Sequence, residues 1–355
     1  KTAYEMLRSL VGSEMCIRDS LVSCVKPGGA MIRRLRVGIS AGVPLCMFLG
    51  CARSDGGGAM APRIDGQWWT VAHNPDLGPL TGEKQQPVDF SVWQAADGTW
   101  QLWSCIRGTK CGGNTRLFYR WEGRRLTDPD WQPMGIAMQA DANHGETPGG
   151  LQAPHVVRAG NEYLMFYGDW EHICLAKGRD GKTFDRWLYR DGKAGMFGEG
   201  EGANTRDPMA IRIGETWHCY YTAFPDQKGA VYCRTSGDLR AWSHSTVVAF
   251  GGRAGTGPYS AECPHVVHRD GCYYLFRTQQ YVNPPETSVY RSKSPMHFGI
   301  NDDRYFVCTL PIAAPEIILH RGRYYVAALL PDLKGIRIAP LAWDAARTAS
   351  LPCSD

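Results

Sequence analysis

The 355-residue chain has no net charge beyond its first fifty residues. Residues 1–50 carry seven of the 39 basic side chains and three of the 35 acidic ones, which leaves 32 of each sign for the remainder. A protein that binds nucleic acid through its phosphates needs a surplus of Lys and Arg. The neutral body therefore argues against a nucleic-acid partner.

Paired cysteines are also missing. No Cys-x-x-Cys pair occurs among the 13 cysteines, which argues against a zinc site, and we expect neither a metal nor a cofactor. Nine cysteines follow Cys51, an odd number that cannot all pair within one chain. Cys105 and Cys111 are close enough to form a disulfide, a question that the sequence leaves open. Three others lie in strand-like runs and are expected to be small buried side chains: Cys219, Cys233 and Cys272.

The N-terminal segment has the pattern of an export signal. Basic residues 31–36 precede the uncharged, mostly apolar stretch 37–49, which is too short to span a bilayer as a helix. Leu49-Gly50-Cys51 resembles the bacterial lipobox, with Phe48 where Leu is usual, and this predicts lipid attachment at Cys51. The expected location is therefore the bacterial cell envelope, with the lipid as the chain's sole membrane contact.

Four regions follow from this pattern. Residues 1–30 precede a second start at Met31 and contain Val11–Ser20, which resembles a translated sequencing adaptor, so we interpret them as a spurious, non-native extension. Residues 31–50 form the signal, and the Gly-rich residues 51–66 are expected to be a flexible tether. Residues 67–350 remain for the folded domain.

A repeat runs through that domain. Four segments align without gaps, and in each a Pro precedes an aromatic residue by nine positions. A fifth segment fits with one extra residue in its turn and Phe90 in place of the Pro. The five anchor positions are Phe90, Pro154, Pro208, Pro264 and Pro315.

Each copy reads as a β-hairpin followed by a third strand and a closing turn. A period of about fifty residues with four short strands per unit is typical of a propeller blade. The repeat therefore predicts an all-β fold, a five-bladed β-propeller with four-stranded antiparallel blades. An irregular β-sandwich is the alternative.

A propeller would gather the polar residues of interest on one face. If the first strand of each blade lines the axis, four long loops share a face: residues 139–152, 191–206, 250–262 and 278–288. Three carboxylates, Asp89, Asp207 and Glu262, stand just before the first strands of three blades and should converge there. Burial and mutual repulsion would raise the pKa of at least one of them. Glycoside hydrolysis uses such a set, with one carboxyl as acid and another as nucleophile or base.

The body resembles the five-bladed propeller glycosidases, the invertase/levanase and arabinanase/xylosidase superfamily of glycoside hydrolase families 32 and 43. Arg206-Asp207-Pro208 is similar to the Arg-Asp-Pro motif of the invertase side, whose Asp stabilises the transition state. Glu262-Cys263 is similar to its Glu-Cys motif, whose Glu is the acid/base. Asp89 takes the place of the nucleophile or base, but Val88 and Phe90 replace the flanking Asn and Pro. That departure leaves fructose specificity and the choice between retention and inversion open.

Other residues are candidates for sugar contacts. Arg206 suits hydroxyl or carboxylate recognition, and Trp170, in an expected mouth loop, is the preferred stacking platform, with Trp93 as another candidate. His265 is a further candidate, although its parallel with His155 also suits a repeated structural hydrogen bond.

The leading hypothesis is a glycoside hydrolase that acts on oligo- or polysaccharides. A carbohydrate-binding lipoprotein with a degenerate site is one alternative. A glycoside phosphorylase or transglycosylase is another, and it would need a cationic phosphate pocket, for which Arg253 and Arg277 are the candidates.

Overall fold

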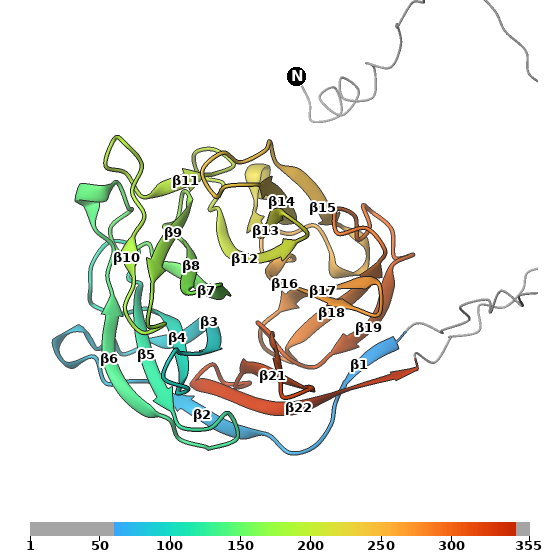
Figure 1. Cartoon of the computed structure of the whole chain (residues 1–355), viewed down its shortest axis with the longest axis horizontal. Helices are drawn as coiled ribbons and strands as arrows, with labels where there is room; N and C mark the ends of the chain where they lie inside the picture. The colour runs from blue at the N-terminus through green and yellow to red at the C-terminus, as the bar shows by residue number, and fades with distance from the viewer. Residues whose placement is uncertain (1–59, 346–355) are drawn as a thin grey trace, which may run out of the picture. The chain divides into compact units, whose positions relative to one another are not determined.

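The computed structural model describes residues 60–345, which form five antiparallel sheets arranged radially around an axis (Figure 1). The five-bladed all-β propeller predicted from the repeat is confirmed. The expected extension at residues 1–30, the signal at 31–50 and the lipid site at Cys51 lie outside the described residues.

Blades 1, 3 and 4 have four strands each, in chain order from the axis outward. Blade 1 comprises β3 (Gln86–Gln94), β4 (Trp100–Arg107), β5 (Leu117–Gly123) and β6 (Gln132–Met138). Blade 3 comprises β12 (Arg206–Ile213), β13 (Thr216–Ala223), β14 (Ala230–Ser236) and β15 (Thr246–Phe250). Blade 4 comprises β16 (Glu262–Arg269), β17 (Cys272–Gln280), β18 (Glu286–Ser292) and β19 (Phe306–Leu310).

In blades 2 and 5 the outer position is divided between two short strands. Blade 2 comprises β7 (Gln152–Ala159), β8 (Glu162–Gly168) and β9 (Ile173–Gly178), and β9 pairs with both β10 (Asp185–Arg186) and β11 (Gly195–Phe197). Blade 5 comprises β20 (Glu316–His320), β21 (Arg323–Leu329) and β22 (Gly335–Ala345), and β22 pairs with both β1 (Met60–Ile64) and β2 (Trp69–His73).

The N-terminal strands therefore complete the C-terminal blade. Met60 pairs with Ala345 and Ile64 with Leu341, and both Met60 and Ile64 pack against the apolar core. The predicted tether at residues 51–66 is wrong in its last part, because residues 60–64 form a strand in the folded body. The Met60 and Ile64 side chains and the backbone pairing hold this strand on β22.

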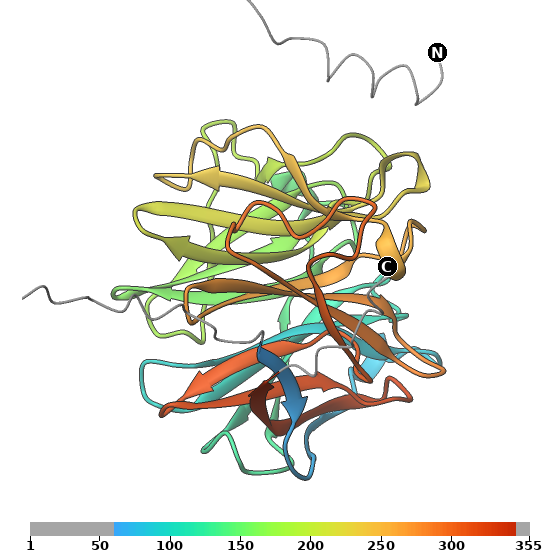
Figure 2. The ribbon, with the colours of Figure 1, turned by 90° about the vertical axis from the view of Figure 1, so that its right-hand side faces the viewer.

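The strands near the axis are buried on both faces, because each sheet packs face to face with its two neighbours (Figure 2). On β8, Phe166 contacts Trp242 of the blade 3 region, and the next residue, Tyr167, contacts Phe118 of blade 1. Both are fully buried. This two-sided burial explains why the sequences of these inner strands are continuous apolar runs and do not alternate between apolar and polar residues.

The cysteines of the described region are free thiols. Cys105 and Cys111 are not bridged, and Cys219, Cys233 and Cys272 are buried, as predicted. Four helices, all 3-10 helices of three residues, occur among residues 60–345: η1 (Gly78–Leu80), η2 (Ala142–His144), η3 (Pro225–Gln227) and η4 (Gly252–Ala254). No helix in this part of the chain is long and apolar enough to cross a membrane.

Candidate active site

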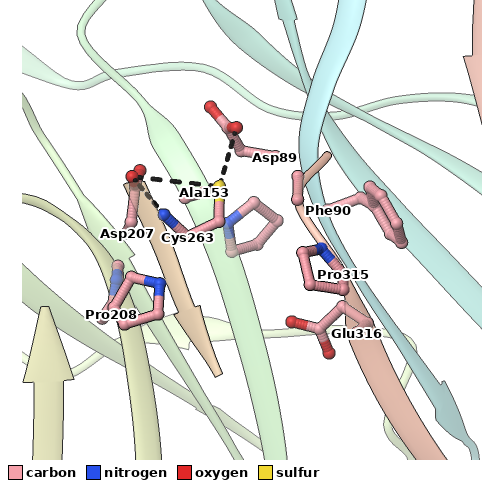
Figure 3. Close-up of a pocket in the computed structure, with 11 residues that line it drawn as sticks. Asp89, Phe90, Ala153, Asp207, Pro208, Cys263, Pro315 and Glu316 are labelled. Atoms are coloured by element: carbon pink, nitrogen blue, oxygen red, sulfur yellow. Dashed lines mark hydrogen bonds between the residues drawn. The ribbon is translucent and has the colours of Figure 1, made fainter. Parts of the chain in front are cut away.

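The five anchor residues surround one small cavity on the axis, as the repeat predicted (Figure 3). The residue before each anchor also lines this cavity and has left-handed backbone, with φ between 37° and 54°. These five equivalent residues are Asp89, Ala153, Asp207, Cys263 and Ala314. Such a backbone costs about 1–3 kcal/mol for a residue other than glycine. The fold therefore imposes one strained position per blade. Two of these five positions carry a carboxylate and a third carries a thiol.

The third predicted carboxylate is not equivalent to the other two. Glu262 lies two residues before its anchor, in the place that Arg206 occupies in blade 3. The Arg206 guanidinium donates to Glu262 Oε1 from Nη2 at 2.7 Å and from Nε at 3.2 Å. The one-residue offset separates a pair of aspartates near the axis from an Arg–Glu pair beside them.

Asp89 is held by two donors from blade 4, one on β16 and one in the loop between β17 and β18. The Tyr281 hydroxyl donates to Asp89 Oδ1 at 2.9 Å, and the Cys263 thiol donates to the same oxygen at 3.2 Å. Burial, reinforced by Asp89, raises the pKa of the Cys263 thiol well above its usual range. The thiol therefore keeps its proton and acts as a hydrogen-bond donor to Asp89 Oδ1.

Asp207 lies across Cys263 from Asp89 (Figure 3). Its Oδ2 accepts the Cys263 backbone N–H at 3.0 Å, whereas its buried Oδ1 has no hydrogen-bond partner. Burial and, next, the negative charge of Asp89 raise the pKa of Asp207 to about 7. Burial also raises the pKa of Glu262, against the opposing charge of Arg206. The cluster can therefore hold a proton at neutral pH, as the sequence argument required of at least one acid.

A pocket of about 430 Å³ opens beside these carboxyls. Each of the four loops expected on this face contributes to it, through Gln152, Asn204, Tyr259 and Tyr281 respectively. Both amide atoms of Gln152 and the Asn204 Oδ1 are buried without a hydrogen-bond partner. The full lining is Asp89, Arg107, Arg116, Gln152, Trp170, Asn204, Arg206, Phe224, Tyr259, Glu262, Tyr281, Val282 and Leu333.

Trp170 lines this pocket, where the sequence placed it, and so does Arg206. Trp170 has a positive φ of 88° and forms an isolated bridge with Thr205, so its backbone is held against its own preference. Tyr259, which the sequence argument missed, is a second aromatic side chain in the lining and is 61% exposed. An indole and a phenol ring are thus available to stack on a ligand.

Trp93 is not part of the site. It follows Phe90 by three residues on β3, which carries it about 10 Å along the strand from the anchor. Its ring is buried against Trp103 and Phe184, and its Nε1 donates to the Gly181 carbonyl at 2.7 Å. Its role is to join blades 1 and 2.

His265 is likewise absent from the pocket and belongs to a buried cluster with His155 and Glu316. The Nδ1 atoms of His155 and His265 lie 3.7 and 3.6 Å from Glu316 Oε1. Burial opposes ionisation of Glu316, but the two imidazoles hold its pKa at about 2. The structural role that the parallel positions suggested fits these contacts better than a sugar contact.

The three ligand atoms of this cluster are within 4.8 Å of one another, close enough to hold a metal ion. However, His265 Nε2 accepts the Ile317 N–H, so a neutral His265 carries its proton on Nδ1. His155 Nε2 donates to the Ala210 carbonyl, which leaves a lone pair on its Nδ1. The cluster therefore offers a metal two ligands, one imidazole and one carboxylate, rather than three.

Several residues that matter here were not among those predicted from the sequence. Cys263 could have been found, because the repeat puts it in the same place as Asp89 and Asp207. Tyr281 lies in a loop that was expected on this face but carried no motif. Arg107, the last residue of β4, and Arg116, just before β5, had no sequence signal at all.

No protein-family model and no curated protein matches this chain. Solved structures match it at low identity. A thermostable family-43 glycoside hydrolase is 17% identical, with a TM-score of 0.54 over 77% of this chain and 92% of that one. A family-32 β-fructofuranosidase from Bombyx mori is 18% identical, with a TM-score of 0.54, and this chain spans 62% of it. A structure from the GH130 family of mannoside phosphorylases and glycoside hydrolases is 13% identical, with a TM-score of 0.53 over 76% and 94% of the two chains. These matches establish a shared five-bladed fold.

Proposed function

We propose that this protein is a glycoside hydrolase that cleaves bonds of oligo- or polysaccharides. The observation that carries the proposal is the set of three carboxyls from three blades beside a pocket with unpartnered amides and aromatic rings. Asp89 and Glu262 line that pocket, and Asp207 lies on the axial cavity next to it. Such a set supplies the two carboxyls that glycosidic cleavage needs, and at least one carboxyl of the set can hold a proton at neutral pH.

Each carboxyl has a role in this proposal. Asp89, with two donors on one oxygen, attacks the anomeric carbon or activates a water molecule. Glu262 is the general acid, because it is the protonatable carboxyl that reaches the pocket. Asp207 lies on the axial cavity beside the pocket, with its Oδ1 buried, and shares the proton of the cluster from there. Trp170 provides the stacking surface, and Arg206 orients Glu262.

The test is a turnover screen of the purified protein on aryl glycosides, fructans, arabinans and xylans. Positioned proton transfer contributes about 10²–10⁴ to the rate, so Glu262→Gln should lose that factor on substrates with poor leaving groups. Aryl glycosides with good leaving groups should be less affected. Glu215→Gln, at a side chain that is 93% exposed, is the matched control and should keep full activity.

The binding-protein alternative makes the opposite prediction. If the wild type binds oligosaccharides but turns over no substrate in the screen, the chain is a carbohydrate-binding protein rather than a hydrolase. If Glu262→Gln retains full activity on unactivated substrates, the acid assignment is wrong.

We also propose that the protein is exported and anchored to the cell envelope by a lipid on Cys51. The support is the basic and apolar pattern that precedes this residue. Cys51→Ser should move the protein from the membrane fraction to the soluble fraction of expressing bacteria. A wild-type protein that is already soluble would refute the anchor.

A further inference from the structure

The pocket contains two guanidinium groups that no carboxylate neutralises. Its lining has three arginines and two carboxylates. Arg206 is paired with Glu262, which leaves Arg107 and Arg116 without an ion pair among residues 60–345. Arg107 donates from Nε and Nη2 to the neutral Gln86 Oε1, at 3.1 and 2.7 Å. Arg116 lies over the Trp170 ring, 5.0 Å from its centroid.

The position of Arg116 is built into the fold. Its backbone N–H donates to the Gly149 carbonyl at 2.9 Å, and its carbonyl accepts the Cys111 thiol at 3.4 Å. The loop before it packs so closely that a Cβ on Gly113 would collide with the Pro148 carbonyl. The backbone of Arg116 is therefore fixed, and its guanidinium lies over the Trp170 ring in the pocket lining, where a ligand could reach it.

The arginines that the sequence suggested for an anion are elsewhere. Arg277 is buried and donates to the backbone carbonyls of Ser260, Gly251 and Gly255. Arg253 stacks on Phe306, 4.0 Å from the ring centroid. Neither lines the pocket.

We propose that Arg107 and Arg116 form an oxyanion subsite inside the pocket, so that the substrate includes an anionic group. A guanidinium fork suits a carboxylate or a phosphate, and the carboxylates of the site would otherwise repel such a ligand. The anion is either the carboxylate of a uronic acid residue in the saccharide or a free phosphate that attacks the sugar in place of water. In the second case phosphate oxygen bonds to the anomeric carbon as the glycosidic bond breaks, and the leaving oxygen takes the proton of Glu262. This inference rests on the proposed function. An acidic saccharide would name the substrate class of the hydrolase, whereas free phosphate would make the same carboxyls catalyse phosphorolysis instead of hydrolysis.

Titration calorimetry on the full chain separates these cases. The probes are d-glucuronate against d-glucose, d-galacturonate against d-galactose, and inorganic phosphate. At least one acidic sugar should bind about tenfold or more tightly than its neutral partner, and the preference should weaken with added salt. Arg116→Gln should abolish the preference, and Arg107→Gln should reduce it. Arg124→Gln, at an exposed arginine outside the pocket, should leave it unchanged.

Phosphate gives the second arm of the test. If phosphate binds with the same dependence on Arg116 and substrate cleavage then releases a sugar phosphate, the subsite takes free phosphate. If no acidic probe or phosphate binds at about 10 mM, or if both pocket variants keep the preference, the subsite does not exist.

Binding is measured without turnover, so the two proposals fail separately. Hydrolysis of neutral glycosides with no preference for an anion would overturn the subsite alone. An Arg116-dependent preference without hydrolysis or phosphorolysis would overturn the catalytic proposal alone.

Discussion

Asp207 should make the folded protein less stable at neutral pH, and Asp207→Asn should therefore stabilise it. Burial and Asp89 raise the pKa of this carboxyl from 3.8 to about 7. Below pH 3.8 both the folded and unfolded states hold the proton, so the group has no effect on folding. As the pH rises toward 7, the unfolded state ionises first, and stability is lost by about 1.36 kcal/mol per pH unit.

The difference between the two pKa values corresponds to about 4 kcal/mol at pH 8. An asparagine cannot ionise, and its amide oxygen can still accept the Cys263 N–H that Asp207 accepts at 3.0 Å. It does lose the attraction of Arg206, whose Nε is 3.8 Å from Asp207 Oδ2. We therefore expect Asp207→Asn to raise the free energy of unfolding by about 2–4 kcal/mol at pH 8, with the gain shrinking toward zero near pH 4.

Urea denaturation followed by tryptophan fluorescence, from pH 4 to pH 8, measures this difference. The matched control is Asp270→Asn, because Asp270 is exposed and its φ of 50° is close to the 54° of Asp207. That variant should change stability by less than about 0.5 kcal/mol at any pH. If Asp207→Asn does not raise the free energy of unfolding at pH 8, or raises it more at pH 4 than at pH 8, the pKa of Asp207 is not raised in the folded protein.

Two further outcomes follow from particular contacts. Tyr281→Phe removes the 2.9 Å donor on Asp89 Oδ1, so kcat should fall by about tenfold or more on every substrate that the wild type cleaves. The control Tyr259→Phe should not lower kcat uniformly in this way. An unchanged kcat in Tyr281→Phe would show that the Cys263 thiol alone positions Asp89. A chain that starts at Gly66 lacks β1 and the half-buried Met60 and Ile64. Its free energy of unfolding in urea should be about 2–4 kcal/mol below that of a chain that starts at Met60. Equal stability of the two chains would mean that β1 does not help to close the propeller.

The fold was predictable because its information is local and repeated. Each blade needs an apolar run, a turn and an aromatic run, and these appear in the sequence at a spacing that needs no knowledge of distant contacts. The anchors Phe90 and Pro315 could be matched across the chain for the same reason, and they meet at the axial cavity. The loops on the pocket face followed from strand direction alone.

The chemistry of the site depended on contacts that the repeat does not encode. Cys263 and Asp89 are 174 positions apart, and their 3.2 Å contact exists because the first strands of two blades lean toward one axis. Glu262 lies two residues before its anchor, whereas Asp207 lies one residue before its own. That offset places the Glu262 carboxylate against Arg206 and outside the axial cavity. Successive side chains of a strand point to opposite faces of the sheet, so a shift of one position gives a side chain different neighbours. The repeat therefore specifies where each blade lies, and the packing of the blades decides which side chains meet.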